Sequence, residues 1–344
     1  MKTMKIIIPM AGFGKRLLQL TQHKPKALVR LADMRLLDHV LNTFEPLEKT
    51  YILEYIFIIG YLGEQIKEHM QDAHPDKKVR YYVQEELKGQ SHAVYLAREA
   101  ISGPVLLTYC DTIIKTDLSY LPSEETDGVV SVKVVDDPRS HGVAVVGPDN
   151  LVKNLVEKPQ TKKNKLVLTG LYHFSEGKDL IKAIETQIQR GTSLNNEYYL
   201  ADAINILLED GKRIRTENVT EWLDAGTPVA MLQTNVYLLQ HRPESHSKIV
   251  TKQTNIFIHP VYIHESSRIE NSIIGPNASI GKNCEITGSI IKNSIVDDDS
   301  TVTDVTIKNS LTGKNCSITG NPMQSITADN DEIGVVLKVN IPLN

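Results

Sequence analysis

The sequence has little cysteine and no long apolar run, and these shortages exclude several kinds of protein. The three cysteines, Cys110, Cys284 and Cys316, are an odd number and lack the spacing of metal ligands. They are therefore expected to be reduced thiols in a cytoplasmic protein rather than disulfide partners. The apolar runs are far shorter than the roughly 20 residues that a membrane-spanning helix needs, so no membrane association is expected.

An excess of positive charge is also missing. The chain carries 38 basic and 42 acidic residues, a net charge of −4, so no broad basic surface and no nucleic-acid partner are expected. The first residues predict a strand that leads into a glycine-rich segment, which does not fit a cleavable signal peptide. With 344 residues, 41% of them hydrophobic, the chain has the length of one large or two ordinary globular domains.

The segment 5–26, with the sequence KIIIPMAGFGKRLLQLTQHKPK, constrains the function most. Its apolar start predicts a buried parallel strand. Gly12 and Gly14 follow, and no acidic residue stands between Gly12 and Lys26. Backbone N–H groups in such a turn, together with clustered cations, form a place for phosphates. The cations of the segment are Lys15, Arg16, Lys24 and Lys26.

Two familiar phosphate-binding patterns are absent from this segment. A P-loop would need Gly where Pro9 stands and a hydroxyl residue where Arg16 stands. A dinucleotide-binding fingerprint would need a third glycine where Leu17 stands. An ordinary surface turn with solvated lysines is the alternative. The preceding strand and the later Pro25-Lys26 pair favour phosphate binding over that alternative.

Residues 1–240 alternate strand-like and helical patterns. This order predicts an α/β fold with a doubly wound, mainly parallel sheet, whose ligands lie at the carboxyl ends of the strands. The strand-rich segment 128–174 is expected to add a substrate-binding layer. Strands are predicted over 56–59, 79–83 and 105–109, and helices over 63–70, 93–101, 179–189, 197–208 and 229–240.

The pattern changes near residue 242. Residues 241–255 are expected to be a linker, and residues 256–344 repeat themselves. Ile-x-Asn-Ser occurs at 269, 291 and 307, and Gly-Lys-Asn-Cys occurs at 281 and 313. An aliphatic residue every five to six positions predicts a hexapeptide-repeat β-helix whose coils bury these residues on one another. Cys284 and Cys316 occupy equivalent positions of the repeat, which favours a packing role for both.

Several motifs of this chain resemble those of the sugar-1-phosphate nucleotidylyltransferases, also called sugar-nucleotide pyrophosphorylases. The resemblance implies a Rossmann-like nucleotidyltransferase fold, and many members carry a left-handed β-helix at the C-terminus, which fits the repeats. Lys15, Cys110 and the Gly89-Gln90-Ser91 turn depart from the usual residues of the family. The matching segments are Gly12-x-Gly14-x-Arg16 with Pro25-Lys26, Asp111 at a strand end, Glu157-Lys158-Pro159, and Trp222-Leu223-Asp224-Ala225-Gly226-Thr227-Pro228.

The resemblance also implies a role for each matching residue. Asp111 and Asp224 would hold Mg²⁺, an ion that prefers oxygen ligands. Gln84 would read the nucleobase, because its amide offers a donor and an acceptor together. The remaining assignments are Arg16, Lys26 and Lys158 as catalytic contacts to phosphates, Ala11, Gly12, Gly14, Lys15 and Gly89 as nucleotide-binding residues, and Glu157, Gly170 and Glu197 as sugar-binding residues.

The implied reaction transfers a nucleoside monophosphate from a nucleoside triphosphate to a sugar 1-phosphate and releases pyrophosphate. dTTP or UTP with glucose 1-phosphate is the first expectation for the substrates. The nucleophile is an already anionic phosphate oxygen, so no Ser-His or Cys-His pair is required. Alignment and positive charge are what the protein must supply.

Two other interpretations stay open. A non-catalytic regulatory subunit on the same scaffold would have lost Arg16, Lys26, Asp111 or Asp224, and all four are present. Acyl transfer in the β-helix would need a catalytic histidine, and His259 and His264 stand at its start outside any matching motif. We expect the β-helix to mediate assembly into a homo-oligomer. It should also be separable from the chemistry, because every chemical motif ends by Pro228.

Overall fold

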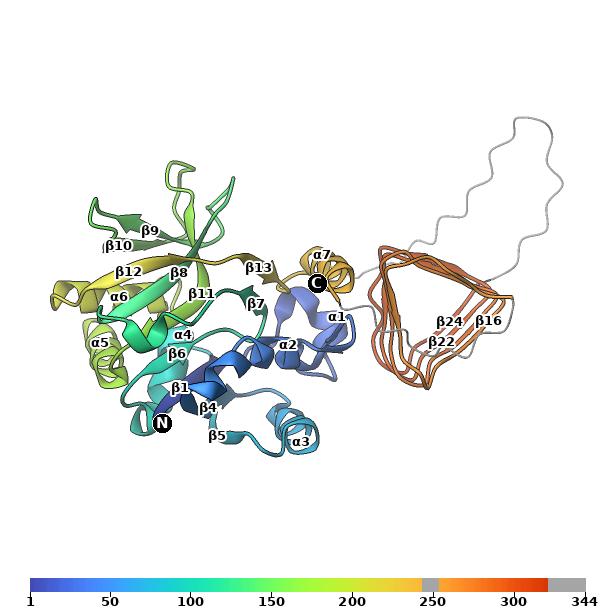
Figure 1. Ribbon diagram of the computed structural model, residues 1–344, viewed down its shortest axis with the longest axis horizontal. Coiled ribbons are helices and arrows are strands. Elements are labelled where there is room, and N and C mark those ends of the chain that lie inside the picture. The colour runs from blue at the N-terminus through green and yellow to red at the C-terminus, as the bar shows by residue number, and fades with distance from the viewer. Residues whose placement is uncertain (243–253, 321–344) are drawn as a thin grey trace.

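The computed structural model describes residues 1–242 and 254–320, and a nine-stranded sheet organises the first of these ranges (Figure 1). The strands of this sheet are β1 (Lys2–Pro9), β4 (Tyr51–Ile59), β5 (Lys78–Val83), β6 (Val105–Leu107), β8 (Gly128–Val134), β9 (Gly142–Val146), β10 (Val152–Glu157), β11 (Leu166–Phe174) and β12 (Ile214–Asn218). Their order is β10-β9-β11-β6-β1-β4-β5, with β8 beside β11 and β12 beside β8.

Both faces of this sheet are buried. Along β1, Ile6 and Ile8 pack into one hydrophobic core and Ile7 into the other. A strand with alternate residues in two cores must be apolar throughout, which explains the run of isoleucines. Helices α2 (Leu36–Asn42), α3 (Gly63–Ala73) and α7 (Pro228–Gln240) supply the first core, and α4 (Gln90–Leu96), α5 (Gly177–Arg190) and α6 (Leu200–Glu209) supply the second.

The predicted doubly wound arrangement is confirmed, with parallel pairing in β6-β1-β4-β5. The segment 128–174 does not form a separate layer, because β11 pairs antiparallel with β6, β8 and β9 and so extends the same sheet. The whole sheet is therefore mixed. Two helices also differ from their predicted bounds. The helix expected over 93–101 is α4 followed by a 3-10 turn at Arg98–Ala100, and the helix expected over 197–208 begins at Leu200 because Tyr199 is extended.

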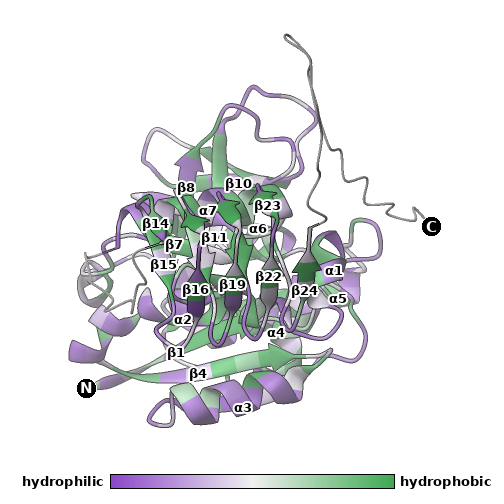
Figure 2. Ribbon diagram, turned by 90° about the vertical axis from the view of Figure 1, so that its right-hand side faces the viewer, coloured by the Kyte–Doolittle hydropathy of each residue, from purple (hydrophilic) through white to green (hydrophobic). Residues whose placement is uncertain are grey.

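Residues 254–320 form the expected parallel β-helix, with three short strands in each of the first three coils and two in the last. The rest of the predicted repeat, 321–344, lies outside the described residues. Residues Ile256, Ile273, Ile290 and Thr306 are in register on one side, so one coil takes 16 or 17 residues, close to three hexapeptides. Figure 2 shows β16, β19, β22 and β24 in successive coils. The three sides are β14 (Ile256–Phe257), β17 (Ile273–Ile274), β20 (Ile290–Lys292) and β23 (Thr306–Lys308); β15 (Val261–Ile263), β18 (Ala278–Ile280) and β21 (Ile295–Val296); and β16 (Arg268–Glu270), β19 (Glu285–Thr287), β22 (Thr301–Thr303) and β24 (Ser317–Thr319).

Asparagine makes many of the turns between these short strands. Asn283, Asn293 and Asn309 have positive φ, a conformation that asparagine tolerates better than most residues. The Asn293 amide also donates to the Asn309 oxygen of the next coil at 2.6 Å. The equivalence of Cys284 and Cys316 in the repeat is confirmed, because Cys284 directly precedes β19 and Cys316 directly precedes β24, which lie on the same side of the β-helix. Cys284 is fully buried in the core of the β-helix.

Buried ion pairs join the β-helix to the α/β part. Asp297 accepts from Arg35 Nη1 at 3.0 Å and also pairs with Lys24, and Asp298 accepts from Arg30 Nη2 at 3.0 Å. The Arg30, Asp297 and Asp298 side chains are each at most 7% exposed. We call these five residues the charged seam. The two-domain division at 241–255 stays a prediction, because most of that segment lies outside the described residues.

Three shorter pieces complete the α/β part. β7 (Thr112–Lys115) pairs antiparallel with β13 (Glu221–Asp224), β2 (Arg30–Leu31) pairs with β3 (Met34–Arg35), and α1 (Leu18–Thr21) follows the glycine-rich segment. Within residues 1–242 and 254–320, no helix has the length and apolar character needed to cross a membrane.

Candidate active site

The glycine-rich segment forms a turn at the carboxyl end of β1. Gly14 has φ 63°, and its carbonyl accepts from Leu17 N at 2.7 Å, which closes the turn. A Cβ on Gly12 would meet nothing within 4 Å, so its backbone faces open space. Gly60 packs so closely on Ala11 that a Cβ there would lie 2.7 Å from the Ala11 oxygen. The turn therefore exposes its backbone to a ligand while β4 supports it from behind.

The cations that follow the turn divide into exposed and paired ones. Lys15 and Arg16 are exposed. Lys26 is bound to Asp111, with Nζ 2.6 Å from Oδ2. Burial alone would raise the pKa of Asp111, but the Lys26 ammonium holds it below its usual value. Asp111 is therefore a charged carboxylate beside the turn. The strand predicted over 105–109 ends at Leu107, so Asp111 lies four residues beyond β6 and directly before β7.

The pairing of β7 with β13 brings the second aspartate to the first. Asp224 stands opposite Thr112 in this pair, and the next residue, Ala225, donates its N–H to the Asp111 carbonyl at 2.9 Å. Two residues that are far apart in the sequence thus hold neighbouring backbone positions. Asp224 Oδ1 in turn accepts from the backbone N–H of Gly226 at 2.8 Å.

Arg16 reaches the same place from the glycine-rich turn. A Cβ on Gly226 would lie 3.0 Å from Arg16 Nη2 and 2.9 Å from Asp224 Oδ1, so these two side chains end close to the same backbone position. Arg16, Lys26, Asp111 and Asp224 thus form one cluster, in which two cations stand beside two carboxylates. Two carboxylates from different segments are a donor set that suits a hard divalent cation.

A second group lies around Glu157 and Lys158 at the end of β10. Lys158 has φ 47°, and its Nζ donates to the Tyr199 hydroxyl at 2.8 Å. Burial raises the pKa of the neighbouring Glu157. Gly170 has φ 92°, and a Cβ there would lie 2.8 Å from the Tyr109 ring. Lys158 and Gly170 therefore have backbone conformations that few substitutes would keep, and Glu157 lies beside them.

The third group joins the end of β5 to the turn before α6. Gln84 Nε2 donates to the Gly89 carbonyl at 3.2 Å. Gly89 has φ 97°, and a Cβ there would lie 2.5 Å from Tyr198 N. The Lys88 carbonyl also accepts from that N–H at 2.9 Å, so the exposed Glu197 is held next to the Gly89 turn. The structure thus brings Glu197, which is predicted to bind the sugar, next to Gln84 and Gly89, which are predicted to bind the nucleotide.

Sequence reasoning missed two residues of these groups. Tyr199 was not singled out, although it stands two positions after Glu197 and contacts Lys158. His141 precedes β9, and its ring lies 5.0 Å from that of Trp222. Burial lowers the pKa of His141. The negative charge of Asp224 opposes this effect, and the positive charge of Arg16 adds to it. Nothing in the local sequence marks His141, whereas the neighbouring Glu197 could have drawn attention to Tyr199.

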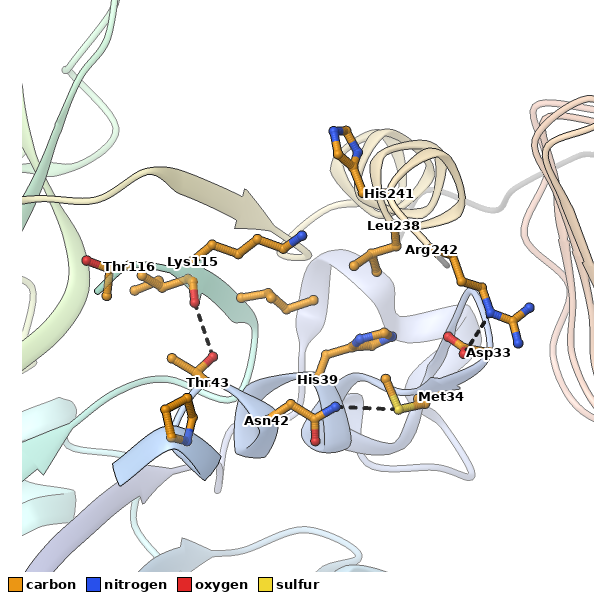
Figure 3. Close-up of a pocket in the computed structure, with 13 residues that line it drawn as sticks. Asp33, Met34, His39, Asn42, Thr43, Lys115, Thr116, Leu238, His241 and Arg242 are labelled. Carbon is orange, nitrogen blue, oxygen red and sulfur yellow. Dashed lines mark hydrogen bonds and ion pairs between the residues drawn. The ribbon is translucent and has the colours of Figure 1, made fainter. Parts of the chain in front are cut away.

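A separate cavity of about 390 Å³ lies between α2, β7 and α7 (Figure 3). None of the residues predicted for the active site lines it. Figure 3 shows Lys115 and His39 on opposite walls, with Arg242 and its partner Asp33 at one end. Burial lowers the pKa of His39, whose Nε2 bonds the Leu31 carbonyl at 2.9 Å.

Comparisons with known proteins agree with this geometry. Residues 5–241 match the family described as Nucleotidyl transferase. The "Bifunctional protein GlmU" of Methanococcus maripaludis is 31% identical over 279 residues, and the match covers 80% of this chain and 62% of that protein. The glucose-1-phosphate thymidylyltransferase of Streptomyces griseus is 25% identical, with 85% and 87% of the two chains covered.

A solved structure shows the same fold. The nucleoside-diphosphate-sugar pyrophosphorylase of Vibrio cholerae superimposes with a TM-score of 0.58 at 21% identity, over 67% of this chain and 99% of that one. The Rossmann-like arrangement predicted from the sequence is confirmed by this likeness and by the sheet order.

Proposed function

The chain belongs to the nucleotidyl transferase family, and from this premise we propose that it transfers a nucleoside monophosphate from a nucleoside triphosphate to a sugar 1-phosphate. The observation that carries the proposal is the cluster of Arg16, Lys26, Asp111 and Asp224 beside the glycine-rich turn. It combines backbone N–H groups, two cations and two carboxylates, which are the groups that a triphosphate with a divalent cation needs.

The reaction breaks the bond between the α-phosphorus and the bridging oxygen, and forms a bond from the sugar-phosphate oxygen to the α-phosphorus. Asp111 and Asp224 would hold Mg²⁺, which supplies positive charge against the transferred phosphoryl group. Lys15 and Arg16 are exposed and free to bind the triphosphate oxygens. Lys26 exchanges Asp111 for a phosphate oxygen, and charge and alignment then lower the barrier without a general base.

The sugar 1-phosphate is assigned to the Glu157–Lys158 group. The Lys158 ammonium is held by Tyr199 at the end of a fixed turn, where it meets one phosphate at a defined position. The half-buried Glu157 carboxylate can accept from sugar hydroxyls, which compensates for its partial loss of water. Gly170 leaves room for the sugar ring beside Tyr109.

Gln84 supports a choice among the nucleobases. Its amide nitrogen is committed to the Gly89 carbonyl and stands 3.1 Å from His92 Nδ1, so the amide oxygen is left as the acceptor for a ligand. Thymine, uracil and guanine present a ring N–H donor on the edge where cytosine and adenine present a ring acceptor. The free amide oxygen of Gln84 is thus compatible with dTTP or UTP, which stay the first nucleotides to test, with glucose 1-phosphate as the first sugar.

A screen of pyrophosphate release tests the proposal. Five nucleoside triphosphates are combined with a panel of sugar 1-phosphates in the presence of Mg²⁺. We expect release that depends on both substrates and is fastest with dTTP or UTP. Release that does not depend on the sugar phosphate would overturn the proposed transfer and indicate hydrolysis of the triphosphate. No release with any pair from a folded protein would favour the regulatory-subunit interpretation.

Lys26 and Lys158 are expected to serve different substrates. Losing one charge-assisted contact costs roughly 1.5–3 kcal/mol, about ten- to a hundred-fold in binding. Lys158→Ala should therefore raise the KM for the sugar 1-phosphate, and Lys26→Ala the KM for the nucleoside triphosphate. Lys163→Ala, at an exposed position after the Glu157–Lys158 group, is the matched control and should change neither. The assignment fails if both variants affect the same substrate.

The β-helix is proposed to mediate assembly into a homo-oligomer. His264, one of the two histidines considered for acyl transfer, has Nδ1 2.9 Å from the Ser266 hydroxyl within its own turn. No specific observation favours acyl transfer there, so the β-helix is assigned no chemistry.

A further inference from the structure

Three metal-ligating side chains meet between α2 and α3, away from the residues of the proposed active site. They are Asp38, the third residue of α2, His69 in α3, and His74, which ends α3. Within residues 1–242 and 254–320, this is the one group of three or more His, Cys, Asp or Glu whose ligand atoms all lie within 4.8 Å of one another.

The geometry of the three side chains is convergent. His69 Nε2 lies 2.6 Å and His74 Nε2 lies 2.9 Å from the same oxygen, Asp38 Oδ1. His74 leaves the helical conformation, with φ −137° and ψ 53°, and its ring then meets the His69 ring at 5.9 Å between centroids. The end of α3 thus folds the second imidazole back toward the first.

The Asp38 carboxylate is fixed in its orientation from the other side. Its Oδ2 accepts from the Arg35 backbone N–H at 3.1 Å, in the first turn of α2. Both oxygens of Asp38 are thus engaged, Oδ1 by the two imidazoles and Oδ2 by the backbone. A partner that orients a ligating carboxylate is a regular feature of metal sites.

We infer that Asp38, His69 and His74 bind one transition-metal ion of the zinc class. Imidazole nitrogens suit Zn²⁺, Co²⁺ and Ni²⁺, whereas Mg²⁺ and Ca²⁺ prefer oxygen donors alone. Ligand atoms about 2.0–2.2 Å from one tetrahedral ion stand roughly 3.3–3.6 Å apart. The present separations of 2.6 and 2.9 Å would have to open by roughly 0.4–1 Å, which small rotations of the side chains can supply.

The surroundings suit a three-ligand site that is open on one side. The side chains of Asp38, His69 and His74 are 13–18% exposed, so an ion can enter and keep a water in its fourth position. The nearby Arg35 guanidinium does not compete for the carboxylate, because it is bound to Asp297 and Asp298. The ion would tie the first turn of α2 to the end of α3.

Metal binding to the full chain tests this inference. Protein stripped with chelator is titrated with Co²⁺ and then Zn²⁺ in excess Mg²⁺, which occupies oxygen-only sites. We expect one equivalent of Co²⁺ with the visible absorption of a four-coordinate nitrogen and oxygen site, displaced by Zn²⁺. Thermal unfolding should shift upward when the ion is bound, since a ligand of the folded state stabilises it.

His69→Gln and His74→Gln, made separately, should each weaken binding by at least about tenfold and abolish the Co²⁺ spectrum. His259→Gln removes an exposed imidazole of the β-helix and should leave both the metal affinity and the Co²⁺ spectrum unchanged. Circular dichroism establishes that each variant is folded. Absence of stoichiometric binding, or equal binding by wild type and both variants, would overturn the inference and leave the cluster as a carboxylate shared by two imidazoles. Because Asp111 and Asp224 take no part, neither result depends on the proposed activity.

Discussion

Asp111→Asn and Asp224→Asn are each expected to lower kcat by about 10²- to 10³-fold, because each removes one of the two carboxylates that would hold Mg²⁺. Charge stabilisation by a bound cation is worth several kcal/mol, and every 1.36 kcal/mol is tenfold in rate. Asparagine keeps the shape of aspartate and loses only its charge. The backbone pairing of β7 and β13, including the Ala225–Asp111 hydrogen bond, does not involve these carboxylates and should hold the fold.

The Asp111→Asn/Asp224→Asn double variant shows whether the two carboxylates hold one ion or contribute to turnover independently. If the two carboxylates hold one ion, losing the second should add little to the loss of the first, since residues that act as a unit are not additive. Asp136→Asn is the matched control, because its side chain is fully exposed and pairs only with Lys165. Steady-state pyrophosphate release is measured for wild type and for all four variants. Undiminished turnover in excess chelator would contradict the metal role for both residues.

Local sequence was enough to predict the elements that carry the proposed chemistry. The apolar run before Gly12 defined β1, and the glycine spacing with its cations defined the turn. The repeat of Ile-x-Asn-Ser predicted the β-helix, because inward aliphatic residues recur with the coil. In each case neighbouring residues alone determine the pattern, so a single sequence contains the whole signal.

Contacts between distant segments could not be predicted in this way. The charged seam joins residues 24–35 to Asp297 and Asp298, and sequence shows only ordinary charges at both places. His141 approaches Arg16 and Asp224 only because the start of β9 and the end of β13 lie near each other in the fold. The Asp38, His69 and His74 group likewise depends on how α3 packs over α2. The hand of the β-helix and the predicted role of Mg²⁺ stay predictions.

The charged seam is the second place where a small change should have a large effect. In the double variant Asp297→Asn/Asp298→Asn, Arg30 keeps its buried position and loses both of its negatively charged partners. Breaking a buried ion pair from one side costs about 3–5 kcal/mol, because the remaining charge is desolvated and unpaired. We expect a fall in the unfolding free energy of that order, measured by denaturant titration. Lys24 stands two residues before Lys26, so the KM for the nucleoside triphosphate should rise as well.

Asp299→Asn is the control for this prediction, because it makes the same change at the next residue. Asp299 pairs with Lys314 at 37% exposure and has φ 59°, which asparagine tolerates well, so a change of at most about 1 kcal/mol is expected. If the Asp297/Asp298 double variant unfolds at the same denaturant concentration as the wild type, the charged seam contributes little to the unfolding free energy.

The pH dependence of stability gives an independent check on the same pairs. Burial would raise the pKa of Asp298, but Arg35 and Arg30 hold it below its usual value. The unfolded chain therefore binds this proton more tightly than the folded one. The stabilisation is present above the ordinary aspartate pKa of about 4 and is lost as the pH falls through the lower folded value. Wild type should lose more stability than the double variant below about pH 4, because only the wild type has these carboxylates to protonate. Parallel curves for the two proteins in that range would contradict the charge-based account of the charged seam.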